Sequence, residues 1–276
     1  MSVSNLILIG GSPRSGTTAI LQLFNSNPCV FVTSEENLLN CQNVLKKLLN
    51  TKTRRDTVIN GTMRELSPRE TLTLENIHSH NFHTEAIWPT LRFIYEYHHN
   101  QIHPEYDLLI WGDKLPGYWR DLKKIMMIPR AKYIHITRNP LDVINSMLRR
   151  TEAAKTGRDW WKNITAFSEM LDVWANAYSS ILSVEDKSNV LHVHYEELLF
   201  NYENTIDRLN HFLECDLEYE NILVADPALH FDRKYLQPNM IDVVKENEIV
   251  QKYIEMLSMD KSMSITSSNA LAMLIE

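Results

Sequence analysis

The chain has few of the features that mark secreted or membrane-spanning proteins. Its three cysteines, Cys29, Cys41 and Cys215, form no spaced pattern, which favours reduced thiols in a reducing compartment over a disulfide framework. No apolar run approaches the roughly 18–20 residues that a bilayer span needs. The N-terminus lacks the basic and apolar regions of a secretory signal peptide. We therefore expect a cytoplasmic protein without a membrane span.

The chain also has fewer positively than negatively charged residues. Lys and Arg total 28 against 35 Asp and Glu, which gives a formal net charge of −7. Proteins that bind polyanions usually carry a positive balance, so nucleic acid and long sulfated polysaccharides are disfavoured as partners. A small anionic ligand in a local basic pocket remains compatible with this charge. No repeat or linker divides the 276 residues, and we expect a single domain over residues 1–276.

Glycine occurs only seven times, and Gly10, Gly11 and Gly16 lie in one stretch, "LILIGGSPRSGTTAIL" (residues 6–21). The stretch predicts a strand, a glycine-containing turn and the start of a helix. Backbone N–H groups and the helix dipole make such a junction a binding site for anions. The common triphosphate-binding loop requires Gly-Lys-Ser/Thr, but this stretch contains no lysine.

Other anion-binding groups stand where that lysine is missing. Arg14 offers a planar fork that can hold two oxygen atoms at once, and Gly16 lets the backbone approach a ligand closely. Hydroxyl donors follow at Ser15, Thr17 and Thr18. The alternative is an ordinary strand–turn–helix joint with a surface arginine, which leaves the run of hydroxyls unexplained.

Short apolar runs followed by helical periodicity predict the fold class. The expected strands are residues 6–9, 108–111, 133–137 and 190–194. Strands that alternate with helices favour an α/β, P-loop-like fold of three layers, with a central parallel sheet flanked by helices. Ligands of such sheets bind beyond the carboxyl ends of the strands. This places the first loop and residues 112–116 and 138–139 on the same rim.

The periodicity of the rest predicts helices of unequal clarity. Pro140 suits the first position of a helix, and residues 160–184 predict one long amphipathic helix. A further helix is expected around residues 206–213. Residues 51–106 show no clear strand, and we interpret them as helices and loops that form a lid or an acceptor-binding insertion.

A second basic cluster lies in "YIHITRNPLDVINSMLRR" (residues 133–150). Arg138 leaves the end of a predicted strand, and Ser146 follows about two helical turns later, so both can lie on one side of the helix start. Arg149 and Arg150 follow one turn beyond. The alternative is a solvated basic helix face. Two anion sites on one rim indicate a nucleotide with phosphates at two places.

With these two motifs the chain resembles the sulfotransferase superfamily, most closely the branch with arginine in the first loop, which includes tyrosylprotein sulfotransferases and many bacterial enzymes. The resemblance covers roughly residues 5–40, 107–150 and 190–215. It implies 3′-phosphoadenosine 5′-phosphosulfate (PAPS) as the sulfate donor. It also implies a three-layer fold and a hydroxyl-bearing acceptor.

The resemblance also assigns roles to residues. The loop for the 5′-phosphosulfate matches Arg14, Ser15, Gly16, Thr17 and Thr18. The 3′-phosphate pair matches Arg138 and Ser146, Arg150 matches a further basic contact, and Tyr195 lies near the adenine. The cytosolic branch has a C-terminal Arg-Lys-Gly element that is absent here; Arg233 and Lys234 are its possible substitutes, without the glycine.

The resemblance further implies which residues act in catalysis. Arg14 offsets charge on the transferring oxygens, and Lys114 in "IWGDKLPGYW" matches a lysine near the scissile bond, although an ion pair with a nearby carboxylate is the alternative. Glu35 falls where the tyrosylprotein branch has its catalytic base. Glu36 is the alternative base. The other reading of this pair is a first helical turn capped by Ser34.

The sequence therefore predicts transfer of a sulfuryl group from PAPS to an acceptor hydroxyl. No metal is expected, because we find no aspartate cluster typical of a metal–phosphate site, and "HSHNFH" (residues 78–83) fits no standard zinc spacing. Alternatives are a P-loop kinase or nucleotide hydrolase, and a non-catalytic nucleotide-binding homologue. The identity of the acceptor and the oligomeric state cannot be derived from these patterns.

Overall fold

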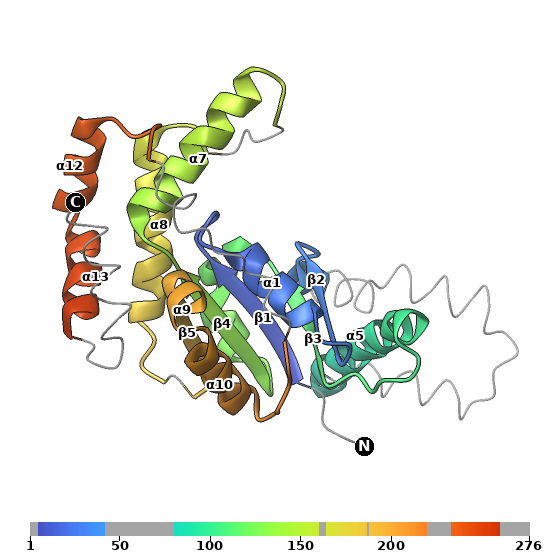
Figure 1. Ribbon diagram of the computed structural model, residues 1–276. Helices are drawn as coiled ribbons and strands as arrows, with labels where there is room; N and C mark the ends of the chain where they lie inside the picture. The colour runs from blue at the N-terminus through green and yellow to red at the C-terminus, as the bar shows by residue number, and fades with distance from the viewer. Residues whose placement is uncertain (1–4, 42–79, 160–163, 187, 220–232, 260–276) are drawn as a thin grey trace, which may run out of the picture.

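The computed structural model describes residues 5–41, 80–159, 164–186, 188–219 and 233–259, with the side chains of residues 80–86 and 259 left out. Its centre is a sheet of five parallel strands in the order β2-β3-β1-β4-β5 (Figure 1). The strands are β1 (Asn5–Gly11), β2 (Val30–Ser34), β3 (Ile110–Lys114), β4 (Ala131–Thr137) and β5 (Val190–His194). Because all five run the same way, their carboxyl ends meet at one edge.

Apolar side chains on both faces of the sheet explain why its strands read as continuous hydrophobic runs. In β1, Ile7 and Ile9 belong to one buried cluster and Leu6 and Leu8 to another, because successive side chains point to opposite faces. The cluster of Ile7 and Ile9 includes residues of α1 (Thr17–Asn25), α9 (Tyr195–Phe200) and α10 (Tyr202–Leu213).

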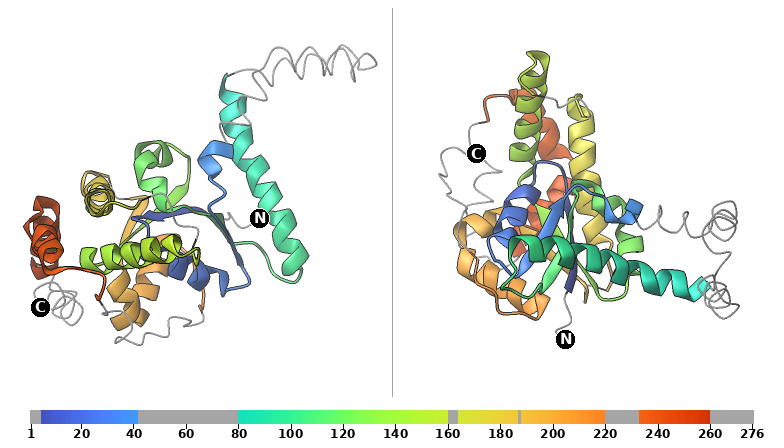
Figure 2. Two further views of the ribbon diagram at one scale, coloured as in Figure 1. Left: turned by 90° about the horizontal axis from the view of Figure 1, so that it is seen from above. Right: turned by 90° about the vertical axis from the view of Figure 1, so that its right-hand side faces the viewer.

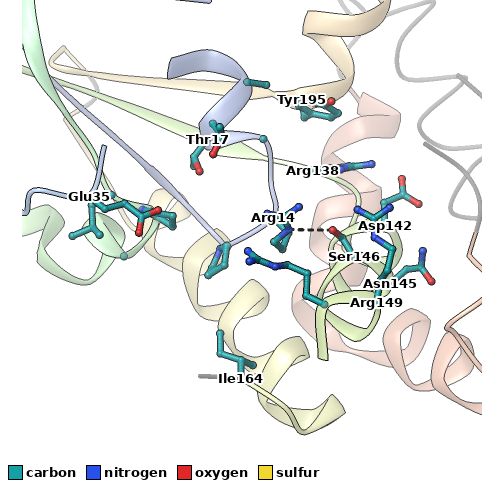
Figure 3. Close-up of a pocket in the computed structure, with 18 of the residues that line it drawn as sticks. Arg14, Thr17, Glu35, Arg138, Asp142, Asn145, Ser146, Arg149, Ile164 and Tyr195 are labelled. Carbon is teal, nitrogen blue, oxygen red and sulfur yellow. Dashed lines mark hydrogen bonds between the residues drawn. The ribbon is translucent and has the colours of Figure 1, made fainter. Parts of the chain in front are cut away.

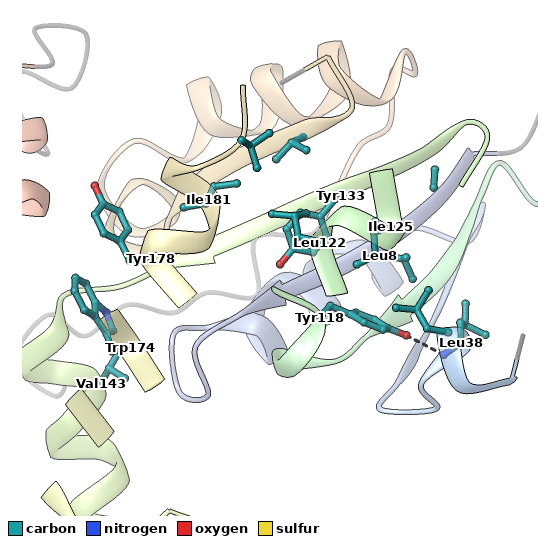
Figure 4. Packing of buried hydrophobic residues seen from close by; sticks show 14 of the residues in the cluster. Leu8, Leu38, Tyr118, Leu122, Ile125, Tyr133, Val143, Trp174, Tyr178 and Ile181 are labelled. Carbon is teal, nitrogen blue, oxygen red and sulfur yellow. Dashed lines mark hydrogen bonds between the residues drawn. The ribbon is translucent and has the colours of Figure 1, made fainter. Parts of the chain in front are cut away.

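The cluster of Leu6 and Leu8 lies on the opposite face and joins more elements. In the left view of Figure 2, α6 (green) and α8 (yellow) lie on the other side of the sheet from α1 (blue) and α10 (orange). Figure 4 shows Leu8 near Tyr118, Leu122, Ile125 and Tyr133 in this packing. The elements are α5 (His80–Ile102), the short 3-10 helix η1 (Pro116–Asp121), α6 (Leu122–Met126), α7 (Pro140–Lys155) and α8 (Phe167–Leu182), with α12 (Pro238–Glu246) and α13 (Glu248–Met259) beyond them. The predicted three-layer α/β fold is confirmed.

Three of the four strand predictions hold, the fourth is displaced along the chain, and one edge strand is missing from the prediction. The runs at residues 6–9, 133–137 and 190–194 lie within β1, β4 and β5. The run at 108–111 is displaced, because β3 (Ile110–Lys114) extends into Gly112, Asp113 and Lys114. The edge strand β2 was not predicted. Its sequence, "VFVTS", is rich in the β-branched residues that favour strands.

The expected helix over residues 160–184 was wrong in its first part. Residues 164–166 are not helical, and α8 begins at Phe167, where the Glu169 carboxylate accepts a hydrogen bond from the Ala166 N–H (3.4 Å). The start of α7 agrees with prediction: Pro140 is its first residue, and the Asn139 side chain accepts a hydrogen bond from the Leu141 N–H (3.0 Å).

The expected insertion at residues 51–106 is described only from residue 80 onward, so residues 51–79 lie outside the described residues. The described part contains α5, whose Ile87, Trp88, Leu91 and Tyr95 are buried in the core. None of the helices among the described residues combines the length and the apolar character that crossing a membrane requires.

Candidate active site

A cavity of about 1150 Å³ opens beyond the carboxyl ends of the strands, next to the first turns of α1 and α7 (Figure 3). Of the residues predicted for the site, those that line it are Arg14, Gly16, Thr17, Thr18, Glu35, Arg138, Ser146, Arg150 and Tyr195. They come from four separate segments of the chain. The parallel sheet brings them together because it places the loops after β1, β2, β4 and β5 at one edge.

The first loop is held by its own internal hydrogen bonds. The Ser15 hydroxyl (2.6 Å) and the Ser15 N–H (3.1 Å) both donate to the Ser12 carbonyl oxygen. Ser15 is fully buried and does not line the cavity, and its predicted role as a hydroxyl donor to a ligand stays a prediction. The short side chain closes the turn. Thr17 and Thr18 do line the cavity, at the start of α1.

Gly16 is required by its conformation and by a neighbour. Its φ of +102° is unfavourable for other residues, and a Cβ there would lie 2.3 Å from Cδ2 of Tyr195. The sequence-based reason for this glycine was close approach to a ligand, but the structure adds a packing reason. Tyr195 thus stands directly against the loop, with its ring also under the Arg138 guanidinium, whose Cζ lies 4.7 Å from the ring centroid.

Arg14 joins two clusters that the sequence analysis treated as separate. Its Nε donates to the Ser146 hydroxyl of α7 at 3.1 Å, as Figure 3 shows. Burial, together with the charges of Arg150, Arg149 and Arg138, lowers the pKa of Arg14. Four guanidinium groups therefore converge on one region of a chain whose net charge is −7. Such a concentration of positive charge suits a ligand with several negative charges.

One of these arginines is held by a carboxylate. Asp159 accepts hydrogen bonds from Nε and Nη2 of Arg150, each at 2.7 Å. These hydrogen bonds, as the largest cause, raise the pKa of Arg150. The bidentate geometry fixes the direction of the guanidinium plane. Arg150 therefore lines the cavity with its guanidinium group held in one orientation by Asp159.

Glu196, which the sequence analysis did not single out, supports the second cluster from below. Its Oε1 accepts the Asn139 N–H at 2.8 Å, next to Arg138 and the start of α7. Complete burial is the largest cause that raises the pKa of Glu196 to about 7, and the hydrogen bond from Asn139 opposes the shift. The sequence feature that could have pointed to Glu196 is its position directly after Tyr195.

Lys114 and Glu35 form an ion pair at 2.9 Å between Nζ and Oε1. The alternative predicted for Lys114, a pair with a carboxylate, is therefore confirmed, and the partner is the predicted catalytic base. The Lys114 side chain is 3% exposed and does not line the cavity, whereas that of Glu35 is 51% exposed and does. Figure 3 shows Glu35 on the other side of Arg14 from Ser146.

Glu36, the alternative base, does not line the cavity, and its backbone N–H donates to Asp113. The reading in which Ser34 caps a helix is wrong. The helical turn begins at Leu38, and the Asn37 side chain accepts the Asn40 N–H at 3.2 Å. Asn37 is thus the capping residue, and Glu35 stands in a turn before the helix with a φ of +66°.

The C-terminal segment contributes to the cavity in a way that the sequence left open. Arg233 pairs with the buried Asp142 of α7 at 3.0 Å, and the Tyr235 N–H donates to the Asn145 side chain at 3.0 Å. These contacts fix the segment on α7, and Lys234 and Tyr235 line the cavity. Arg233 is therefore the anchor, while Lys234 is the basic residue that faces the cavity.

Among the residues that the structure describes, no group of three or more His, Cys, Asp or Glu side chains is placed to hold a metal ion. His78 of the "HSHNFH" stretch lies outside the described residues, and so do the side chains of His80 and His83. The positively charged residues that line the cavity are arginines and Lys234.

The fold and the cavity define a P-loop-like α/β protein with a strongly basic cavity beside the first loop. The profile of the "Sulfotransferase family" matches residues 7–221, and the chain belongs to this family. The resemblance noted from the sequence is thus confirmed. No curated protein sequence matches the chain significantly.

Solved structures of two sulfotransferases are similar to the chain at low sequence identity. The sulfotransferase domain of the Synechococcus PCC 7002 olefin synthase is 18% identical, with 94% of this chain and 97% of that chain covered and a TM-score of 0.50. The sulfotransferase STF9 from Mycobacterium avium is 13% identical, with 93% and 77% covered and a TM-score of 0.47. At 18% identity the likeness to the olefin synthase domain concerns the fold alone.

Proposed function

We propose that the protein transfers a sulfuryl group from PAPS to the hydroxyl of an acceptor. The observation that carries the proposal is that Arg14 and Arg138, expected at opposite ends of the donor, line one cavity together with Tyr195. A ligand with phosphate groups at two places, joined by a nucleoside, matches this distribution of charge and aromatic surface. The acceptor remains defined only by its hydroxyl group.

The donor's two anionic ends are assigned to the two motifs. Gly16, Thr17 and Thr18, at the N-terminus of α1, hold the 5′-phosphosulfate, because a helix start favours negative charge. Arg138 and Ser146 hold the 3′-phosphate, with Arg150 as a further cation, and Tyr195 lies beside the adenine. Arg14 exchanges its hydrogen bond to Ser146 for the sulfuryl oxygens when the donor binds.

The reaction proposed is an in-line displacement at sulfur. The acceptor oxygen forms a bond to sulfur while the bond between sulfur and the 5′-phosphate oxygen breaks. The acceptor's proton passes to the Glu35 carboxylate. Lys114 then stabilises the phosphate oxygen that leaves, and Arg14 offsets the charge of the transferring oxygens. For this step Lys114 exchanges at least part of its ion pair with Glu35 for the donor.

The donor is tested first by binding. Thermal unfolding is measured with 3′-phosphoadenosine 5′-phosphate (PAP), ADP and ATP at equal concentrations, because a ligand of the folded state raises the melting temperature according to its affinity. We expect PAP to give the largest shift. A larger shift with ATP and magnesium would favour the kinase or hydrolase alternative and contradict the proposal.

Transfer is tested with radiolabelled PAPS and a panel of phenols, sugars, lipid alcohols and tyrosine peptides. In Glu35→Gln, PAP binding is expected to persist while turnover falls at least ~100-fold, the usual effect of losing an acid–base group. Glu36→Gln is the matched control, since Glu36 does not line the cavity. Equal turnover of Glu35→Gln and the wild type removes Glu35 from the mechanism. PAP binding without transfer to any acceptor favours the non-catalytic homologue.

A further inference from the structure

A fully buried carboxylate lies beneath the turn that carries Glu35. Asp113 of β3 is 0% exposed and does not line the cavity. It is paired in register with Thr33 of β2, so it lies next to the end of the strand from which the turn leaves. The carboxylate accepts four hydrogen bonds: from the Thr33 hydroxyl (2.9 Å), the Glu36 N–H (3.2 Å), the Asn37 N–H (3.0 Å) and the Tyr118 hydroxyl (2.6 Å).

The turn above Asp113 has an unfavourable backbone. Glu35 and Asn37 have φ values of +66° and +54°, in the left-handed region that residues other than glycine seldom adopt. This conformation turns the N–H groups of Glu36 and Asn37 toward the Asp113 carboxylate, as in the backbone nests that bind anions. A buried anion at the centre of the nest therefore offsets the cost of the conformation.

Tyr118 extends the same network by one residue. Its hydroxyl oxygen accepts the Leu38 N–H at 2.9 Å, which Figure 4 shows, and the hydroxyl donates to Asp113. Three consecutive N–H groups, those of Glu36, Asn37 and Leu38, are thus held by Asp113 and Tyr118. The Glu35 N–H donates to the Lys114 carbonyl oxygen at 2.7 Å. The backbone of the turn is therefore fixed on β3 and η1 at every residue from 35 to 38.

The direction of the Glu35 side chain depends on this backbone. The side chain is 51% exposed, and its hydrogen bond within the described part of the chain is the one with Lys114. Packing contributes little to the placement of so exposed a group. We propose that Asp113 is a positioning residue for Glu35: its carboxylate holds the left-handed turn that aims the Glu35 carboxylate into the cavity. This inference rests on the role of Glu35 in the proposed function.

Asp113→Asn tests the inference with little change of shape. All four groups around the carboxylate donate hydrogen bonds, so the amide nitrogen of asparagine would face donors and release part of the turn. A displaced catalytic group costs up to ~100-fold in rate. We expect kcat to fall about 10–100-fold, with the KM for PAPS and the affinity for PAP within about two-fold of wild type.

A double-mutant cycle separates positioning from a general structural role. If Asp113 acts through Glu35, the variant Glu35→Gln/Asp113→Asn has a kcat within about three-fold of Glu35→Gln alone, because the function that Asp113 supports is already absent. Multiplicative losses in the double variant would overturn the inference. A normal kcat for Asp113→Asn in an active enzyme would do the same.

Hydrogen exchange of the peptide that covers residues 35–38 gives a readout independent of turnover. Faster exchange is expected in Asp113→Asn, and unchanged exchange overturns the inference even if no acceptor is found. Tyr118→Phe serves if Asp113→Asn does not fold. It removes the acceptor of the Leu38 N–H and one donor to Asp113, and should accelerate exchange at Leu38 and lower kcat several-fold.

The control variant is Glu197→Gln. Glu197 is also a buried carboxylate, pairs with Arg208 at 2.8 Å and does not line the cavity. It should lower stability while leaving kcat and the exchange of residues 35–38 unchanged. Failure of the proposed function can be told apart from failure of the inference about Asp113, because the wild type itself would then show neither a preference for PAP nor sulfuryl transfer.

Discussion

Glu196→Gln gives a quantitative test of the raised pKa of Glu196, the buried carboxyl group beneath the second basic cluster. The wild-type carboxyl has a pKa of about 7, raised from its ordinary value of 4.5 chiefly by complete burial. Between pH 4.5 and 7 the folded chain therefore binds a proton at Glu196 that the unfolded chain has released. The free energy of unfolding falls as the pH rises through this window, and above it the loss is complete at about 3 kcal/mol.

Glu196→Gln removes this dependence of the free energy of unfolding on pH and keeps the hydrogen bond from the Asn139 N–H. Its amide oxygen can still accept the Asn139 N–H that Oε1 accepts at 2.8 Å, but it carries no charge at any pH. Relative to wild type, the free energy of unfolding of Glu196→Gln should rise by about 2 to 3 kcal/mol between pH 5 and pH 8. Any constant cost of the new amide group cancels in this difference.

Urea denaturation of both proteins at pH 5 and pH 8 measures the difference directly. Other titrating groups cancel because both proteins contain them. One example is His135, whose pKa burial lowers to about 3, so that its contribution to stability is lost as the pH falls below 6.5. The exposed Glu203→Gln is the control for a substitution of Glu by Gln at the surface. A change below about 0.5 kcal/mol for Glu196→Gln would refute the reasoning, since one pKa unit corresponds to about 1.4 kcal/mol.

Two further predictions concern the cavity and its anchor. Gly16→Ala should lower PAP affinity at least ~10-fold by calorimetry, because its φ is +102° and the new methyl group would lie 2.3 Å from a Tyr195 ring carbon. Wild-type affinity would show that Tyr195 does not constrain the loop. Arg233→Met should lower the free energy of unfolding by about 3 kcal/mol, because it leaves the buried Asp142 carboxylate without its partner. The double variant Asp142→Asn/Arg233→Met should recover most of this loss, and no recovery would contradict a role for the pair.

The sequence by itself determined the local elements and the chemistry that they carry. The apolar run at residues 6–9, followed by a glycine turn, favours a strand that is buried on both faces of a sheet. A strand, a turn with Gly16 and a helix start favour anion binding through local geometry alone. Arg14 and Arg138 were therefore predictable as site residues, Tyr195 was implied by the resemblance, and all three line the cavity.

The bounds of β2, β3 and α8 were predicted poorly or not at all, because local sequence patterns define them only weakly. The edge strand β2 is only five residues long, and β3 ends in Gly112, Asp113 and Lys114, which are not apolar although they are buried. Helical periodicity in residues 160–184 predicted too early a start, since periodicity does not define where a helix is capped.

Only the tertiary structure decided which distant groups meet. The bond from Arg14 to Ser146 and the pairing of Lys114 with Glu35 join residues far apart in the chain. Asp113 and Glu196 gained their roles because buried charges must find hydrogen-bond donors, and the donors nearest to them in space were backbone N–H groups of the Glu35 turn and of Asn139. Local propensities specify the elements, whereas packing specifies the partners of buried polar groups.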